Sequence, residues 1–245
     1  MAQCSLLWHG DCPKEAWWLF ESGEALELSA LKTLLDTAEQ AIRLRGAFHC
    51  VLAGGTTPLA IYQRLANVSC GQANFERWFL YLGDERVYPS GHPQRNQQMI
   101  EDAWLRKEQV PKTQIFWMKT ELGLEAAASD YAEKIAGVTF DLVLLGMGED
   151  GHTASLFPNH ALIEQQGLIL ETAAPKAPQQ RLSLSYETLN RAENVMILVT
   201  GSAKQQALQQ WYHCQKEAQP CALPVSQIHG QEQTWVLLDL AAFSG

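Results

Sequence analysis

One loop of the sequence carries a histidine between glycine and threonine, two residues after a carboxylate. Asp150 and His152 lie in the glycine-rich segment 146–153, which follows an apolar run at residues 140–145. Imidazole exchanges protons near neutral pH, so a histidine held open by glycines beside a carboxylate suits a general base. Isolated histidines are more often structural than catalytic. This setting favours catalysis, with His152 as the base and Asp150 lining the site.

A second segment, Gly-Gly-Thr-Thr-Pro at residues 54–58, joins an apolar run to a helical pattern. Thr57 suits the N-cap of that helix, and Pro58 suits its first position. The start of the helix would offer free amides and the positive end of its dipole to a phosphate. A plain strand-to-helix turn is the alternative, because two adjacent glycines are weak evidence by themselves. The whole arrangement favours an anion site built from Gly54, Gly55, Thr56 and Thr57.

Charged residues also stand at the ends of other apolar runs. Arg86 could bind an anionic or carbonyl oxygen, and Asp84 could orient a hydroxyl or a histidine. Arg181 and Lys204 are candidates for a phosphate clamp. Each of these residues alone is more typical of a solvated loop. Their position at predicted strand ends in an acidic chain is what favours a functional interpretation.

Other kinds of site are disfavoured by spacing. The six cysteines are scattered, and His160 with Glu164 would supply only two metal ligands. The Gly-x-Gly at residues 146–148 lacks the third glycine and the acidic residue of a dinucleotide site. Neither a P-loop nor a Gly-x-Ser-x-Gly elbow occurs in the chain. We therefore expect no metal and no cofactor.

The elements that must position these residues alternate between strands and helices. Apolar strand-like runs occur at residues 48–53, 78–82, 140–145, 194–200 and 234–238. Helical patterns occur at residues 24–44, from residue 58 onward, and at 122–135 and 203–212. This alternation predicts a doubly wound α/β fold, a mostly parallel sheet with helices on both faces. Such sheets bind ligands at the carboxyl ends of their strands. We expect one domain over residues 1–245.

Composition limits the partners and the compartment. The net charge of −9 and the pI of about 5.2 disfavour nucleic acid and anionic membranes, which require a basic face. The first residues lack a basic region followed by an apolar run, and no apolar run is long enough to span a membrane. We expect a cytoplasmic protein with reduced thiols, acting as a monomer or a weak homo-oligomer.

Taken together, three of these segments resemble the 6-phosphogluconolactonase family. The matching residues are 54–58, Asp-Glu-Arg at 84–86, and Gly-Met-Gly-Glu-Asp-Gly-His-Thr-Ala-Ser-Leu-Phe-Pro at 146–158. Later motifs that end at Arg181 and Lys204 are also similar to that family. The resemblance implies a Rossmann-like fold of the sugar-phosphate isomerase and deaminase type. It further implies hydrolysis of 6-phosphoglucono-1,5-lactone to 6-phosphogluconate, the second step of the oxidative pentose phosphate pathway, with the phosphorylated sugar lactone as partner.

The resemblance also assigns roles. His152 would be the general base, Arg86 would contact the substrate or the catalytic loop, and Asp84 and Asp150 would line the site. The phosphate would lie against Gly54, Gly55 and Thr56, helped by Arg181 and Lys204. The chain departs from the family pattern in having Tyr88 before Pro89 and Arg95 before Asn96. Arg95 alters the expected loop contacts, because a large charged group replaces a small hydroxyl.

Two other functions compete with this interpretation. Glucosamine-6-phosphate deaminases resemble the chain at residues 54–58, but they carry Asn-Gly-His-Ile-Gly-Phe where this chain has Asp-Gly-His-Thr-Ala-Ser at residues 150–155, and Tyr in place of Arg86. A sugar-phosphate sensor of a transcription regulator would need a DNA-binding element. The few residues before the first predicted strand leave no room for a helix-turn-helix.

Overall fold

A sheet with the strand order β1-β2-β12-β11-β7-β3-β4-β6 forms the centre of the computed structural model, which describes residues 4–9 and 15–243. Neighbouring strands are parallel, except that β1 and β2 pair antiparallel at one edge. The strands are β1 (Cys4–His9), β2 (Glu15–Phe20), β3 (Phe48–Leu52), β4 (Trp78–Leu82), β6 (Ile115–Phe116), β7 (Leu142–Gly146), β11 (Asn194–Val199) and β12 (Gln233–Asp239).

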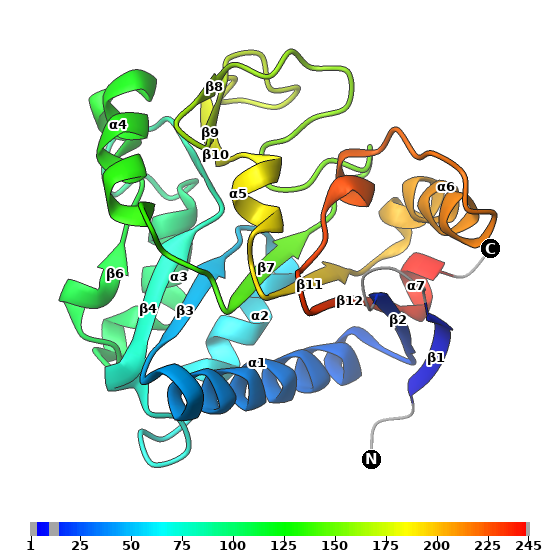
Figure 1. The fold of residues 1–245 in the computed structure, drawn as a ribbon, viewed down its shortest axis with the longest axis horizontal. Helices are drawn as coiled ribbons and strands as arrows, with labels where there is room; N and C mark the ends of the chain where they lie inside the picture. The colour runs from blue at the N-terminus through cyan, green and yellow to red at the C-terminus, as the bar shows by residue number, and fades with distance from the viewer. Residues whose placement is uncertain (1–3, 10–14, 244–245) are drawn as a thin grey trace.

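Helices cover both faces of this sheet, as the alternating pattern predicted. Figure 1 shows α1 along one face, and α5, α6 and a second, smaller sheet on the other side. The helices are α1 (Gly23–Arg45), α2 (Thr56–Leu65), α3 (Asn96–Ala103), α4 (Leu124–Ile135), α5 (Tyr186–Asn190), α6 (Gln205–Lys216) and α7 (Leu240–Phe243). Short 3₁₀ segments are η1 (Phe75–Arg77), η2 (Leu105–Lys107), η3 (Lys112–Gln114), η4 (Thr120–Leu122), η5 (Ser202–Lys204) and η6 (Pro224–Gln227). The predicted doubly wound fold is therefore confirmed.

The helix α1 shows why the sequence folds locally as it does. Ser22 caps its start by accepting a hydrogen bond from the Ala25 amide, and Gly46 ends it with φ at 80°. Its buried side chains recur at helical spacing, at Leu26, Ala30, Leu34, Ala38 and Ala41. This stripe packs α1 against the sheet and against α2.

The second sheet was not anticipated. It is antiparallel with the order β5-β10-β9-β8 and contains β5 (Asp84–Arg86), β8 (Glu164–Gln165), β9 (Leu168–Glu171) and β10 (Arg181–Leu184). The interpretation of residues 84–86 as a solvated loop is wrong, because Asp84 and Glu85 are buried in β5. Their carboxylates find partners inside the protein, which the local pattern of charges could not reveal.

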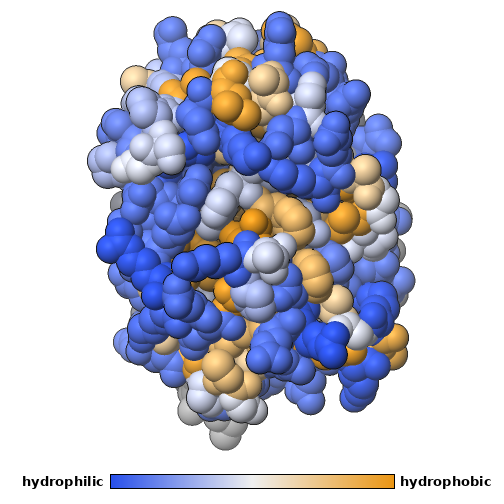
Figure 2. Space-filling view, turned by 90° about the vertical axis from the view of Figure 1, so that its left-hand side faces the viewer, coloured by the Kyte–Doolittle hydropathy of each residue, from blue (hydrophilic) through white to orange (hydrophobic). Residues whose placement is uncertain are grey.

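The surface is mostly hydrophilic on the side of α4 and β6, with apolar groups between the charged ones (Figure 2). Among the described residues, no helix is long and apolar enough to cross a membrane. The described cysteines, Cys4, Cys50, Cys70, Cys214 and Cys221, form no disulfide with one another. Cys12 lies outside the described residues.

Candidate active site

One cavity of about 550 Å³ opens beyond the carboxyl ends of β3, β7 and β11. It brings together every site residue predicted from the sequence, namely Gly54, Gly55, Thr56, Thr57, Asp84, Arg86, Asp150, His152, Arg181 and Lys204. Further residues on its wall include Asn96, Gly148, Glu149, Phe157, Lys176 and Thr200. The strand ends of a doubly wound sheet thus converge on a shared cavity, as this fold class requires.

The candidate base is paired with the carboxylate beside it. Asp150 Oδ1 lies 2.5 Å from His152 Nδ1 and also accepts a hydrogen bond of 3.1 Å from the His152 amide. Burial raises the pKa of Asp150, but the charge and the hydrogen bonds of His152 outweigh this and lower it overall. Because an ionised carboxylate only accepts, Nδ1 carries the proton and Nε2 of the neutral ring is left as an acceptor.

The imidazole is held from two sides. A β-carbon on Gly148 would lie 2.0 Å from His152 Nδ1, so only glycine leaves room for the ring there. On another side, the Phe157 ring centroid lies 4.6 Å from that of His152. Phe157 is buried and also has the Arg181 guanidinium 5.7 Å from its ring centroid. Backbone and aromatic ring together restrict the orientation of His152.

Distant segments anchor the loop that carries His152. The carbonyl of Gly151 accepts a hydrogen bond of 3.1 Å from the Val225 amide, and Leu223 packs where a side chain on Gly151 would have to lie. Gly151 also adopts φ of 80°, which favours glycine. Further along, Ser155 Oγ donates a hydrogen bond of 2.6 Å to Asp84 Oδ2. Asp84 therefore orients a hydroxyl, as one predicted option proposed, and the carboxylate partner of His152 is Asp150.

The start of α2 also lines the cavity and lacks a side-chain cap. The N-cap residue is Gly55, with φ of 101°, and not Thr57 as predicted, because the helix begins two residues earlier. The Thr57 side chain instead points across to β11, where the two hydroxyl oxygens of Thr57 and Thr200 lie 2.6 Å apart. Uncapped amides at a helix start, together with the dipole, form a site for an anion.

Lys204 lines the same cavity and is partly buried. Burial lowers the pKa of Lys204, while Glu149 opposes this shift and Lys176 adds to it. Lys176 and Glu149 form an exposed ion pair, with a distance of 3.7 Å between Nζ and Oε1. A bound anion would stabilise the two lysine charges, which supports the predicted place of Lys204 in a phosphate site.

The two arginines are held differently from simple surface cations. Arg86 donates from Nη1 to the Gln94 carbonyl at 2.7 Å, and its buried Nε has no hydrogen-bond partner among the described residues. Arg181 donates from Nε and Nη2 to the carbonyls of Pro178 and Lys176. Burial lowers the pKa of Arg181, Asp84 opposes this, and Arg86 adds to it. Arg181 thus also shapes the loop that carries Lys176.

Sequence reasoning missed the connecting role of Asn96. Its Nδ2 donates to the Asp84 carbonyl at 2.8 Å and to Asp84 Oδ1 at 3.0 Å. Its Oδ1 lies only 2.1 Å from where a β-carbon on Gly54 would stand. Asn96 thereby joins the glycine turn to β5. The residue belonged to the matched family pattern, which was the available signal, but nothing local to α3 indicated these contacts.

The two departures from the family pattern lie outside the cavity wall. Tyr88 stacks on His92 with 3.9 Å between the ring centroids. Arg95 is buried and donates to Glu121 and to the Met118 carbonyl. Among residues 4–9 and 15–243, no group of three or more His, Cys, Asp or Glu side chains is arranged to hold a metal ion.

Comparison with known proteins gives one consistent family. The family model described as glucosamine-6-phosphate isomerases/6-phosphogluconolactonase matches residues 21–236. A 6-phosphogluconolactonase of Synechocystis sp. is 36% identical over 223 residues, covering 87% of this chain and 90% of that protein. The GDH/6PGL endoplasmic bifunctional protein of Oryctolagus cuniculus is 39% identical over 178 residues, 68% of this chain. The match covers only 22% of that longer relative.

Solved structures agree with the sequence comparison. The crystal structure of 6-phosphogluconolactonase from Thermotoga maritima has a TM-score of 0.82 and 27% sequence identity. The alignment covers 92% of this chain and 100% of that one. The arrangement of β-strands and helices around the cavity is therefore shared with an enzyme of known structure.

Proposed function

Because this chain belongs to the glucosamine-6-phosphate isomerase and 6-phosphogluconolactonase family, we propose that it hydrolyses 6-phosphoglucono-1,5-lactone to 6-phosphogluconate. One observation supports the proposal most directly. The His152–Asp150 pair and the uncapped start of α2 line the same cavity. A base and an anion site in the same cavity fit a substrate that carries both a phosphate and an ester.

The reaction begins with water between His152 and the lactone carbonyl. Nε2 accepts a proton from the water as its oxygen bonds to the carbonyl carbon, because Asp150 keeps the other proton on Nδ1. When the tetrahedral intermediate collapses, the bond from the carbonyl carbon to the ring oxygen breaks. The protonated imidazole returns its proton to that oxygen, which becomes the free hydroxyl of the product. A positioned base of this kind contributes roughly 10²–10⁴-fold.

The remaining residues stabilise charge and fix the substrate. The Arg86 guanidinium stabilises the negative charge that develops on the carbonyl oxygen, an effect of about 2.7–4 kcal/mol for one well-placed donor. The amides of Gly55 and Thr56, the Thr57 hydroxyl and the Lys204 ammonium bind the phosphate. Holding the phosphate orients the ester toward His152, which turns the encounter with water into an ordered reaction.

The decisive experiment measures product formation from freshly generated lactone, scored above the spontaneous rate of opening. We expect wild-type protein to accelerate the reaction, and we expect His152→Ala to lower kcat by about 10²–10⁴-fold. His160→Ala is the matched control, because His160 also pairs with a carboxylate, Glu171 at 2.9 Å, but lies outside the cavity wall. Near-normal turnover in His152→Ala would remove His152 from the mechanism.

The same preparation separates the competing activities. Release of ammonia from glucosamine-6-phosphate, without acceleration of lactone opening, would identify a deaminase. Binding of 6-phosphogluconate without turnover of either substrate would identify a sensor. Neither outcome is compatible with the proposed hydrolase.

A further inference from the structure

A charged side chain stands buried behind the cavity wall. Arg95 directly precedes α3, and its side chain is only 1% exposed. Nη1 donates to Glu121 Oε2 at 2.7 Å, and Nη2 donates to the Met118 carbonyl at 2.8 Å. Nε lies 3.6 Å from Glu85 Oε2 and has no hydrogen-bond partner among the described residues. A guanidinium removed from water in this way needs a nearby negative charge.

Two carboxylates supply it: Glu121, which pairs with Nη1, and Glu85, which faces Nε and whose side chain is fully buried in β5. Glu85 Oε1 accepts hydrogen bonds from the amides of Arg86 and Asn96, and Oε2 accepts one from the amide of Gln97, each at 2.8 Å. Burial raises the pKa of Glu85, whereas these amides and the Arg95 charge oppose the rise. The carboxylate therefore joins two elements, β5 and the start of α3, through three backbone amides.

Both joined elements carry residues of the cavity. Arg86 extends into it from β5, and Asn96 holds Asp84 and lies against Gly54 from the start of α3. A change in the position of the Glu85 carboxylate would thus move the guanidinium at one end and the glycine turn at the other. No other described segment supplies a cation within ion-pair distance of Glu85.

We infer that Arg95 is a positioning residue for the reaction, acting by holding the Glu85 carboxylate between β5 and α3. Through that carboxylate it aligns Arg86 and Asn96 with the cavity. The inference rests on the proposed function, in which Arg86 stabilises the developing charge. If Arg95 had only a structural role, its substitution would lower the melting temperature and leave the kcat of the folded protein unchanged.

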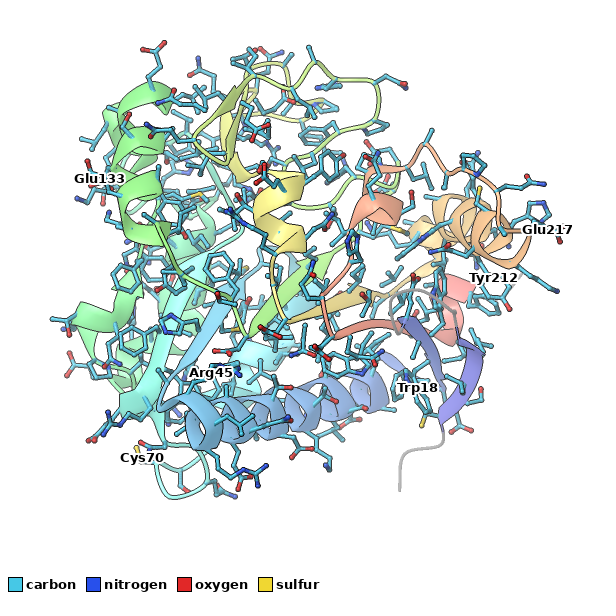
Figure 3. The ribbon with its side chains drawn as sticks, viewed as in Figure 1. Trp18, Arg45, Cys70, Glu133, Tyr212 and Glu217 are labelled. Carbon is cyan, nitrogen blue, oxygen red and sulfur yellow. The ribbon has the colours of Figure 1, made fainter. Side chains whose placement is uncertain are left out.

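The chain offers a matched control for that distinction. Arg45, at the end of α1, pairs with the buried carboxylate of Asp141, which accepts a hydrogen bond from the His49 amide. The chemistry is similar, but Asp141 immediately precedes β7 and so lies at the amino end of the sheet, away from the cavity. Figure 3 shows Arg45 close to the end of α1, far from the second sheet. Arg45→Met therefore removes a cation from a buried carboxylate without touching the site.

The experiment compares Arg95→Met, Arg95→Lys, Arg45→Met and the double variant Glu85→Gln/Arg95→Met. Amide hydrogen exchange is measured at Arg86, Asn96 and Gln97, together with kcat, KM and melting temperature. In Arg95→Met we expect exchange at these amides to rise and kcat to fall by about 10-fold or more, because small displacements of positioned groups are costly. Arg95→Lys should recover part of the kcat and part of the protection of these amides from exchange. Arg45→Met should lose stability while keeping kcat and these exchange rates.

The pH dependence provides a second readout. Arg95 is the charged group that acts on the Glu85 carboxylate, and it also pairs with Glu121. Asp84 and Arg86 are the charged neighbours of Glu85 along β5, and Arg181 lies opposite Arg86 on β10. Burial already raises the pKa of Glu85 in the folded wild-type protein, and loss of the Arg95 charge raises it further. Stability of Arg95→Met should therefore fall as pH rises above the ordinary carboxyl value of 4.5, relative to wild type. The double variant should lack this fall.

Each outcome decides the inference. Wild-type kcat and wild-type exchange at the three amides in Arg95→Met would overturn it. If Arg95→Met does not fold, Arg95→Lys supplies the test: a lower kcat with faster exchange at the three amides supports the inference, and wild-type values of both overturn it. If wild-type protein lacks lactonase activity, the proposed function fails, while the exchange rates still test the link between Arg95 and Glu85.

Discussion

At the scale of single residues, the geometry of the site depends on where side chains are absent as much as on where reactive groups are present. Gly148 contributes no chemistry, yet its missing side chain is what admits the His152 ring. The imidazole then lies between the Gly148 backbone, the Phe157 ring and the Asp150 carboxylate. In the proposed mechanism, a base held in this way does not need to be ordered by the substrate, which favours the reaction.

A first prediction follows from this packing. In Gly148→Ala the new methyl group would lie 2.0 Å from His152 Nδ1, so the ring must move. We expect kcat to fall by about 10²-fold, the cost of displacing a catalytic group by about 1 Å. Steady-state kinetics on fresh lactone provide the measurement. Gly146→Ala is the control, since its β-carbon would meet nothing within 4 Å, and equal losses in both variants would contradict the steric argument.

A second prediction concerns the carboxylate. In Asp150→Asn the amide can donate to Nδ1, which moves the imidazole proton to Nε2 and removes the acceptor for water. We expect kcat/KM to fall toward the loss seen for His152→Ala, by about 10²–10⁴-fold. Glu187→Gln, at an exposed ion pair outside the cavity wall, should retain activity. Full activity in Asp150→Asn would show that the pair does not set the tautomer.

The lowered pKa of Asp150 also predicts the direction in which stability changes with pH. Its pKa is lowered in the folded protein from the ordinary 3.8, since the effects of His152 outweigh burial, so the ionised Asp150 carboxylate stabilises the fold above that pH. The contribution is lost as pH falls through the folded value. Thermal melts should therefore show a difference between wild type and Asp150→Asn that shrinks below about pH 3.8. If the difference in melting temperature between wild type and Asp150→Asn instead grows as the pH falls, the pairing of Asp150 with His152 does not stabilise the fold.

At the scale of elements, the regular parts were predictable because their patterns are local. The strands β3, β4, β7, β11 and β12 overlap the five predicted apolar runs, since strands covered on both faces are almost wholly apolar. The start of α2 was misplaced by two residues because glycine in the N-cap leaves little trace in the sequence. The strand β5 was missed because its buried carboxylates, Asp84 and Glu85, find their partners elsewhere in the chain. The strand β10 was missed because it pairs with β5, a segment far away in the sequence.

The site residues were predictable for a related reason, and their supports were not. Glycine, histidine and carboxylate next to one another on a loop form a local pattern, so His152 and Asp150 could be chosen from the sequence as candidates, and the structure places both in the cavity. Leu223 reaches the same loop from far along the chain, and Ser155 bonds to β5. These contacts form only when the whole chain folds, and no spacing of residues in the sequence predicts them.

The helix α1 allows the effect of a local sequence signal, the N-cap residue, to be tested away from the cavity. Ser22→Ala removes the hydrogen bond that the Ala25 amide donates to the serine oxygen. We expect a loss of about 1 kcal/mol in the free energy of unfolding, or roughly 2–4 °C in Tm for a chain of this size. Ser22→Asp should keep most of the stability that Ser22→Ala loses, because aspartate also caps helix starts. Lactonase kinetics should not change, and a loss of activity in Ser22→Ala would mean that α1 affects the cavity.

At the scale of the whole molecule, an acidic protein has to attract an anionic substrate. The net charge is −9, and Arg86, Lys176, Arg181 and Lys204 nevertheless line one cavity. Their charges act at short range, because salt screens exposed charges beyond about 8 Å under physiological conditions. In the proposed function, capture of the phosphate therefore depends on these local cations and on the start of α2, and not on the net charge of the protein.

This local capture predicts stabilisation by the product. A ligand at 100 times its dissociation constant stabilises the folded state by about 2.7 kcal/mol, which corresponds to a rise in Tm of roughly 5–11 °C for a chain of this size. We expect 6-phosphogluconate to produce such a rise and gluconate at equal concentration to produce little, because gluconate lacks the phosphate. Lys204→Met should weaken the effect of 6-phosphogluconate, whereas Lys112→Met, at an exposed ion pair far from the cavity, should not. Equal stabilisation by gluconate and 6-phosphogluconate would place recognition on the sugar and remove the phosphate site from the start of α2.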